Sequence, residues 1–294
     1  MTSASSPSQQ GKVWFITGAS TGFGRLLAEH LLAQGANVVA TARKPEQLTD
    51  LTAKYASNVQ ILPLDVTSQS QIDAAVKDAL GRFGHIDVLV NNAGYGLTGA
   101  FEEVTEDEYM PMFNTNVFGL IQMTQALLPH FRERRSGNIV FLSSIGGLIG
   151  LPGWAFYNAT KFAVEGLGEA LGLELAPLGV HVTIVEPGPV RTDFLGRSGV
   201  AAKNIIPDYA ETAGKTREYF NSQAGKQAGD PQKAIEAIVS AVEAPKPPRH
   251  LLLGKLALER YQAKVAAFQA DIDAWKETTV GADFPGHTAV TPYK

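Results

Sequence analysis

Short apolar runs rich in β-branched residues alternate with longer stretches of helical periodicity along most of the chain. The apolar runs cover residues 13–17, 37–41, 59–64, 86–91, 138–143 and 180–186, and residues 250–253 form a candidate seventh run. Each is too apolar for a strand with one solvated face, so a sheet covered on both sides is expected. The alternation predicts parallel βαβ units.

Residues with capping preferences mark the ends of the intervening helices. They are Gly35 after the first helix, Ser68 with Gln71 and Thr105 with Glu108 as two capping boxes, and Asp230 with Pro231 at the start of a late helix. Right-handed crossovers leave few topologies for this order of elements. The predicted fold class is therefore α/β, a single-domain, Rossmann-like, doubly wound parallel sheet of about seven strands flanked by helices.

The segments outside this alternation divide the chain further. Residues 1–11 are polar and are expected to form a disordered N-terminal tail, followed by the Rossmann-like catalytic domain at residues 12–256. Within that domain, residues 191–229 lack a clean period and follow the end of a strand, which is typical of a mobile lid or binding loop. Residues 257–275 have helical character, so residues 257–294 are interpreted as a C-terminal helical extension and tail that covers a pocket or adds to an interface.

Composition and charge exclude several classes of function. The 294 residues carry a net charge of -4 and their 25 lysines and arginines are scattered, so nucleic-acid binding is not expected. The chain has no cysteine, and its six histidines form no pair with ligand spacing, so neither a disulfide nor a metal site is expected. No apolar run reaches the roughly 18 residues that span a bilayer, and the first residues lack a signal-peptide core. A cytoplasmic protein without a membrane partner is the expectation.

Three glycines lie at the turn between the first strand and the first helix. They are Gly18, Gly22 and Gly24, in the spacing GxxxGxG. Glycines at this place let backbone N–H groups approach a pyrophosphate, and the start of the following helix stabilises its charge. A glycine-rich turn without a ligand is the alternative, which the flanking strand and helix make less favourable.

The end of the second strand distinguishes the two nicotinamide cofactors. An acidic residue there would bind the ribose 2′-hydroxyl of NAD, but the strand ends in Arg43 and Lys44. A guanidinium at this place favours the 2′-phosphate of NADP(H), and Arg25 is a second candidate for the same phosphate. The alternative is that Arg43 and Lys44 are only solvated loop residues.

Tyr157 and Lys161 are four residues apart in a predicted helix, so their side chains share a face. A nearby ammonium favours the phenolate and brings the tyrosine pKa from about 10 towards the range of proton exchange at neutral pH. Such a pair alone is common on helices. Here Ser144 also follows a strand, at the edge of the sheet where ligands bind in open α/β folds.

Together these features resemble the classical short-chain dehydrogenase/reductase family from Lys12 to about residue 253. The matching residues are Thr17, Gly18, Gly22, Gly24, Asp65, Val66, residues 91–94, Asn116, Ser144, residues 157–161 and residues 187–192. Finer stretches such as NNAGYG and EPGPVRT resemble the 17β-hydroxysteroid dehydrogenase-like subgroup. Phe23 and Thr160 differ from the usual family residues without affecting the chemistry.

The resemblance implies an oxidoreductase that interconverts a ketone or aldehyde and an alcohol, with NADP(H) as cofactor because of Arg43. Tyr157 would exchange the proton with the substrate oxygen, Ser144 would hydrogen bond that oxygen, and Lys161 would lower the tyrosine pKa and hold the ribose. Asn116 would anchor a water, with Pro111 interrupting its helix to make room. The cofactor-binding residues implied are Gly18, Ser20, Thr21, Gly22, Phe23, Gly24, Arg43, Asp65, Val66, Asn92, Ala93, Gly94, Tyr157, Lys161, Pro187, Gly188, Val190 and Thr192.

Substrate contacts are expected from Ser144, Tyr157, Tyr95 and Trp154. Because most residues after the strand ends are apolar or aromatic, a bulky hydrophobic substrate is expected. Tyr95 and Trp154 are equally consistent with ordinary core or rim aromatics. Small residues in the helix after Tyr157 favour a homodimer or homotetramer formed through that helix, although close packing on the chain's own sheet explains them too.

Two other functions compete with this interpretation. A related enzyme could use the same fold for dehydration or epimerisation, but the intact set of Ser144, Tyr157, Lys161 and Asn116 favours redox chemistry. A non-catalytic NADP(H)-binding sensor or scaffold protein could keep the glycine turn without Tyr157 or Lys161, and both are present here.

Overall fold

A computed structural model of the chain describes residues 11–195 and 198–286. Its centre is a seven-stranded parallel sheet with the strand order β3-β2-β1-β4-β6-β7-β9. The strands are β1 Val13–Ile16, β2 Asn37–Ala42, β3 Val59–Pro63, β4 Val88–Asn91, β6 Gly137–Leu142, β7 Val180–Pro187 and β9 His250–Leu253. All seven predicted runs are therefore strands, and the predicted α/β, Rossmann-like fold is confirmed.

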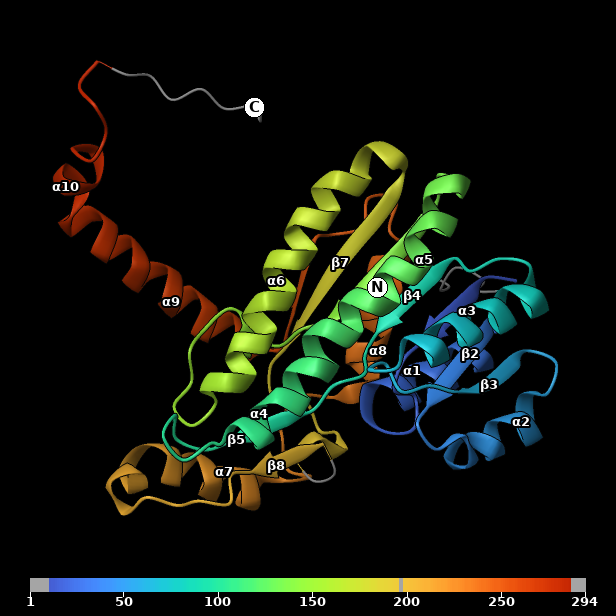
Figure 1. Cartoon of the computed structure of the whole chain (residues 1–294), viewed down its shortest axis with the longest axis horizontal. Coiled ribbons are helices and arrows are strands. Elements are labelled where there is room, and N and C mark those ends of the chain that lie inside the picture. The colour runs from blue at the N-terminus through green and yellow to red at the C-terminus, as the bar shows by residue number, and fades with distance from the viewer. Residues whose placement is uncertain (1–10, 196–197, 287–294) are drawn as a thin grey trace, which may run out of the picture.

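Helices cover both faces of this sheet (Figure 1). The helices are α1 Gly22–Ala33, α2 Thr49–Tyr55, α3 Gln69–Phe83, α4 Glu106–Phe113, α5 Leu120–Arg134, α6 Ala155–Leu175, α7 Lys215–Gln223, α8 Pro231–Glu243, α9 Lys255–Ala274 and α10 Lys276–Val280. One core cluster joins α1 and α8 to one face of the sheet. A second cluster joins α3, α5 and α6 to the other face.

The strands are buried on both faces, as their composition predicted. In the register of the sheet, Phe15 of β1 lies opposite Val39 of β2 and Leu89 of β4, and all three side chains are fully buried. Burying large apolar side chains on both faces stabilises each strand by roughly 1.5–3 kcal/mol per side chain. This core fixes the carboxyl ends of the strands along one edge of the sheet.

The helix ends agree with the sequence except at one place. Asp230 accepts hydrogen bonds from the backbone of Gln232 and Lys233, and the Thr105 capping box at α4 is formed. The capping box predicted for Ser68 and Gln71 is wrong. The Gln71 side chain instead accepts a hydrogen bond at 2.8 Å from the backbone N–H of Asp65, so it is not available to the start of α3.

The predicted lid, which the structure describes at residues 191–195 and 198–229, is tied to the body near both ends and through one short strand. Val190 and Gly229 form an isolated bridge where it begins and ends. In between, β8 Gly199–Ala201 pairs in parallel with β5 Gly96–Thr98, and α7 follows. The sequence did not indicate these two three-residue strands, because such short segments carry no recognisable alternation.

The extension forms a helical arm, α9 and α10, that leaves the body after β9 (Figure 1). The helix predicted at residues 257–275 is therefore present. The predicted tails fall largely on residues 1–10 and 287–294, outside the described residues. Among the helices that are described, none combines the length and the apolar character needed to cross a bilayer.

Two of the small residues of α6 have a reason within the chain itself. A side chain at Gly168 would lie 2.7 Å from Ile184 of β7, and one at Gly172 would lie 2.7 Å from Arg249. Close packing on the chain's own sheet therefore explains both glycines. A side chain at Gly166 would meet nothing within 4 Å.

Candidate active site

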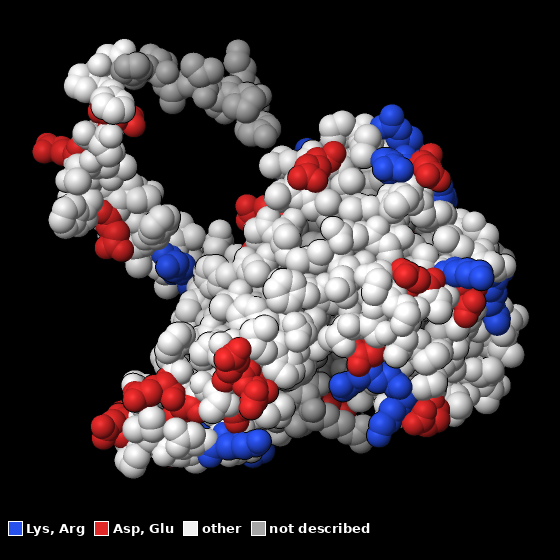
Figure 2. Space-filling view, viewed as in Figure 1, with Lys and Arg blue, Asp and Glu red and all other residues white. Residues whose placement is uncertain are grey.

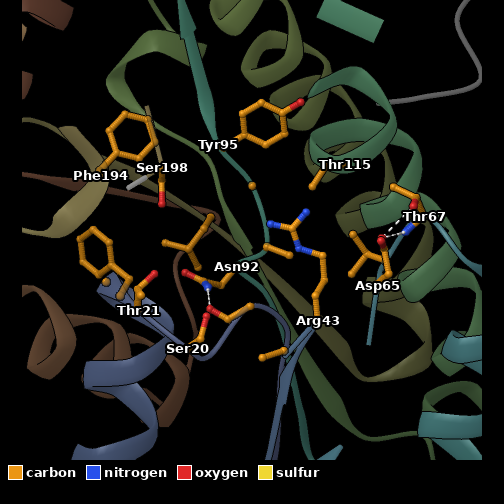
Figure 3. Close-up of a pocket in the computed structure, with 18 of the residues that line it drawn as sticks. Ser20, Thr21, Arg43, Asp65, Thr67, Asn92, Tyr95, Thr115, Phe194 and Ser198 are labelled. Carbon is orange, nitrogen blue, oxygen red and sulfur yellow. Dashed lines mark hydrogen bonds between the residues drawn. The ribbon is translucent and has the colours of Figure 1, made fainter. Parts of the chain in front are cut away.

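A cavity of about 670 Å³ lies at the carboxyl ends of β1, β2, β4 and β6 (Figure 3). It contains most of the cofactor-binding residues expected from the sequence. Those that line it are Gly18, Ser20, Thr21, Gly22, Phe23, Arg43, Asp65, Val66, Asn92, Ala93, Gly94, Tyr157, Lys161 and Thr192. Of the other expected residues, Pro187, Gly188 and Val190 line a neighbouring cavity, and Gly24 lies beneath the loop.

The glycine turn is held close to the loop after β4. Gly18 has a φ of 66°, and a Cβ there would lie 2.9 Å from the backbone of Ala93. The Asn92 amide donates to the carbonyls of Thr17 and Gly18, both at 2.9 Å. A Cβ at Gly24 would lie 2.5 Å from that same amide, so only glycine fits at both positions. The turn is thereby held at the start of α1, where unpaired N–H groups attract an anion.

The two arginines expected near a 2′-phosphate differ in their surroundings. The Arg43 side chain follows β2 and points into the cavity between Asn92 and Asp65 (Figure 3). No ion pair in the described part of the chain includes it. Arg25 instead pairs with Glu29 at 2.7 Å and with Asp50, outside the cavity. Two carboxylates hold the Arg25 guanidinium away from the cavity, so the structure brings Arg43 but not Arg25 to its wall.

Tyr157 and Lys161 lie side by side on α6, and both are almost completely buried. The Lys161 Nζ lies 5.8 Å from the centre of the Tyr157 ring and donates a hydrogen bond of 2.6 Å to the carbonyl of Leu142. Burial lowers the pKa of Lys161 to about 8 and raises the pKa of Tyr157 to about 12, partly offset by a hydrogen bond with Ser144. The expected lowering of the tyrosine pKa by Lys161 is not found, because burial has the larger effect.

Asn116 lies behind the cavity rather than in its wall. It belongs to a π-helical turn, Asn114–Gly119, between α4 and α5, so the predicted interruption after Pro111 takes this form. Its side chain accepts from the backbone N–H of Tyr95 at 3.0 Å and donates to the carbonyl of Tyr95 at 2.9 Å. A further bond of 3.2 Å reaches Thr160. Asn116 thus joins the loop after β4 to α6, beside Lys161.

A second cavity of about 490 Å³ opens on the other side of Tyr157. Its walls include Ser144, Trp154 and the predicted lid, and are largely apolar. Tyr157, Phe23, Thr192 and Phe194 line both cavities. Tyr95, expected to contact substrate, lines the first cavity instead, together with Arg43 (Figure 3).

The second cavity also contains a polar group that the sequence did not indicate. Gln227 is 3% exposed, and both its Oε1 and its Nε2 lack a hydrogen-bond partner among the described residues. A buried amide without a partner is costly, so a water or a polar ligand atom in this cavity would stabilise it. A single glutamine in an irregular segment gives no sequence signal.

A cluster of buried acids lies behind Lys161 and was also missed. Glu165 follows Lys161 by one helical turn and accepts a hydrogen bond from Ser143. The fully buried Glu186, at the end of β7, contacts the Nδ1 of His250 at 2.8 Å. Burial raises the pKa of Glu165 to about 7 and the pKa of Glu186 to about 8. The i, i+4 spacing of Lys161 and Glu165 was the available signal.

Known proteins share this architecture. The sequence profile of the family described as short chain dehydrogenase matches residues 12–202. The chain is 38% identical over 274 residues to Oxidoreductase BOA17 of Botryotinia fuckeliana, which covers 92% of this chain and 99% of that protein. A crystal structure of a short-chain dehydrogenase from Streptomyces avermitilis is 44% identical, with a TM-score of 0.87 over 93% of this chain and 99% of that one.

A structural relative with a bound cofactor is also similar. A short chain dehydrogenase from Burkholderia cenocepacia, solved in complex with NADP, has a TM-score of 0.70 and 28% identity, covering 91% of this chain and 98% of that one. The profile match spans the strands and helices that carry Gly18, Arg43, Ser144, Tyr157 and Lys161.

Proposed function

Because the chain belongs to the short-chain dehydrogenase family, we propose that it is an NADP(H)-dependent oxidoreductase that interconverts bulky hydrophobic ketones or aldehydes and the corresponding alcohols. The observation that carries the proposal is the position of Tyr157, whose side chain lines both cavities. A proton donor at this junction can serve a carbonyl in the second cavity next to a cofactor in the first.

The first cavity fits a dinucleotide in two respects. Its floor is the glycine turn, where Gly18 lies too close to Ala93 to carry a Cβ, followed by the start of α1. Such a turn accepts a pyrophosphate. Its wall presents the Arg43 guanidinium, which suits a 2′-phosphate through charge-assisted hydrogen bonds. When bound, the nicotinamide supplies or accepts the hydride.

Proton exchange is the task of the chain's own residues. With a pKa of about 12, Tyr157 keeps its proton at neutral pH and can donate it to the oxygen of a carbonyl substrate. Ser144, hydrogen bonded to Tyr157, stabilises the developing negative charge on that oxygen. Lys161, still mostly charged at pH 7, stabilises the phenolate left behind.

Asn116 is the fourth residue of the proposed catalytic set, and its role is to hold other groups in position. Its amide holds the loop that carries Gly94 and Tyr95 against α6, and Lys161 lies next to that loop. A π-helical turn leaves backbone carbonyls without their usual partners, which suits an ordered water near the lysine. This water is the proposed route by which the lysine exchanges protons with solvent.

The second cavity supports the choice of substrate class. Leu151, Pro152, Trp154, Val190 and Phe194 form an apolar surface around Tyr157. Such a surface binds a bulky hydrophobic skeleton, and the free amide of Gln227 adds one polar anchor. We propose a substrate with a large apolar body and a hydroxyl or carbonyl remote from the reacting carbon. A steroid-like skeleton, as the 17β-hydroxysteroid dehydrogenase-like motifs imply, is one such substrate. We also propose that the protein is cytoplasmic.

The direct test measures NADPH and NADH oxidation at the nicotinamide absorbance with a panel of aliphatic, aryl and steroid ketones. NADPH-dependent turnover of bulky ketones is expected. Tyr157→Phe should retain NADPH binding, followed by fluorescence, and lose roughly 10²- to 10⁴-fold in kcat. Tyr55→Phe is the control, since Tyr55 lines neither cavity. Full turnover by Tyr157→Phe would overturn the assignment. NADPH binding without turnover of any ketone would favour a sensor or scaffold protein.

A further inference from the structure

The arm formed by α9 and α10 carries a regular apolar stripe that the body does not cover. The stripe consists of Leu258, Tyr261, Val265, Phe268 and Ile272 of α9 and of Trp275, the residue that follows α9. The six side chains are between 38% and 66% exposed, and Ala257 is the one buried residue among those of α9. Figure 2 shows the arm standing clear of the body. A helix of about 30 Å without tertiary packing is only marginally stable in water.

The spacing of the stripe is that of a helix seam. Its members follow one another at intervals of three and four residues in strict alternation, which gives the 3.5-residue period of two helices packed along their length. A helix that only covers a sheet or a cavity usually has a wider apolar face. The arm therefore has the pattern of a helix that packs against one other helix.

The charges on α9 and α10 indicate which helix this is. The first half of the arm has three basic residues and one acidic residue: Lys255, Arg260, Lys264 and Glu259. The later part, residues 271–277, has three acidic residues and one basic residue: Asp271, Asp273, Glu277 and Lys276. This distribution opposes the helix dipole, which favours acids at the start and bases at the end. A second copy of the arm, lying antiparallel, would place each acidic half against a basic half.

We propose that α9 pairs in antiparallel orientation with α9 of a second copy of this chain, and that this pairing forms a two-fold interface. In the matching register, Leu258 faces the partner's Trp275, Tyr261 faces the partner's Ile272, and Val265 faces the partner's Phe268. Each layer then combines one aliphatic and one aromatic side chain, which fills space evenly. Lys264 lies beside the partner's Asp271 at the flank of the seam.

The parallel alternative is less favourable. It would stack Tyr261, Phe268 and Trp275 each on its own copy, in three aromatic layers, and would align the like-charged halves of the two arms. It would also bring both bodies to the same end of the helix pair, because α9 starts directly after β9. The antiparallel pairing separates the two bodies by about the length of one arm.

The first test measures the mass of the full chain by sedimentation velocity at micromolar concentration. Phe268→Asp is expected to halve the mass of the assembly, because it introduces a charge into the central layer. Ala270→Asp is the matched control: it places the same residue two positions along, on the face opposite the stripe, and should leave the mass unchanged. Equal masses for the unaltered chain and Phe268→Asp would overturn the proposal.

The second test determines the orientation and uses the fact that the chain has no cysteine. In the antiparallel register Gln262 lies beside the partner's Gln269, whereas along the axis two copies of Gln262 are about 13 Å apart and two copies of Gln269 are about 8 Å apart. Gln262→Cys and Gln269→Cys are mixed, allowed to exchange subunits and oxidised. A disulfide that joins one variant to the other is expected. A disulfide within either variant alone, or none in the mixture, would overturn the antiparallel pairing.

Discussion

Replacing one buried carboxyl behind Lys161 should change how stability depends on pH. Glu186 is fully buried, and its Oε2 has no hydrogen-bond partner among the described residues. The groups that face the pair of acids are His250, Ser143 and the more exposed Glu169. Glu186→Gln keeps the shape of the side chain and removes its titration.

The sign follows from the pKa values. The pKa of Glu186 is about 8 in the folded chain and the pKa of Glu165 is about 7, against 4.5 for the ordinary carboxyl. As the pH rises above 4.5, the unfolded chain therefore releases these protons first, and stability falls until the pH passes the folded values. Between pH 6 and pH 8 the loss is roughly 2 kcal/mol for Glu186 and roughly 1 kcal/mol for Glu165.

Urea unfolding at pH 6, 7 and 8 at constant ionic strength measures this effect. The difference in unfolding free energy between Glu186→Gln and the unaltered chain should grow by roughly 2 kcal/mol in favour of the variant over this range. Glu169→Gln, on the solvent side of the same cluster, should follow the unaltered chain within about 0.5 kcal/mol. Parallel curves for Glu186→Gln and the unaltered chain would refute the reasoning, because Glu186 would then be ionised in the folded state.

Three further predictions concern the two cavities. Arg43→Ala should raise the KM for NADPH roughly 10- to 100-fold and leave the KM for NADH nearly unchanged, since one charge-assisted contact is worth about 1.5–3 kcal/mol. Lys44→Ala is the control. Equal effects of Arg43→Ala on both cofactors would contradict the 2′-phosphate assignment. Gly24→Ala should lower the unfolding free energy by about 1–3 kcal/mol and weaken NADPH binding, because its Cβ would lie 2.6 Å from the carbonyl of Gly18. The control is Gly81→Ala in α3, where a Cβ meets nothing within 4 Å. In the same denaturation assay this control should be neutral or stabilising. Gln227→Leu should reduce kcat/KM by roughly 10-fold for a bulky ketone that carries a remote hydroxyl but not for its deoxy analogue, and an unchanged ratio of the two would show that the amide does not contact substrate.

The sequence predicted the parts of the site that depend on strand ends. Gly18, Arg43 and Ser144 each lie within two residues of the end of a strand, so the parallel sheet brings them to one edge wherever the helices lie. Tyr157 and Lys161 share a helix face by spacing alone. These positions depend on local periodicity and strand order, which are readable from one chain.

The sequence did not predict positions that depend on tertiary packing. The pairing of β5 with β8 joins segments about a hundred residues apart in the chain, and neither has a pattern of its own. Arg25 forms an ion pair with Asp50, and Gln71 accepts a hydrogen bond from the backbone of Asp65. Neither partner is adjacent in the sequence, so neither interaction was expected. Burial decided the direction of the Tyr157 pKa, and burial depends on the whole fold.

The attachment of the lid joins the walls of the two cavities. The lid is closed at its ends by Val190 and Gly229, and its middle strand is hydrogen bonded to β5, directly after the loop that carries Gly94 and Tyr95. A movement of the lid over a substrate must therefore pull on, or break from, a segment that lines the first cavity. Under the proposed function, a cofactor and a substrate that each change the stability of this strand pair would by reciprocity alter each other's affinity by the same factor.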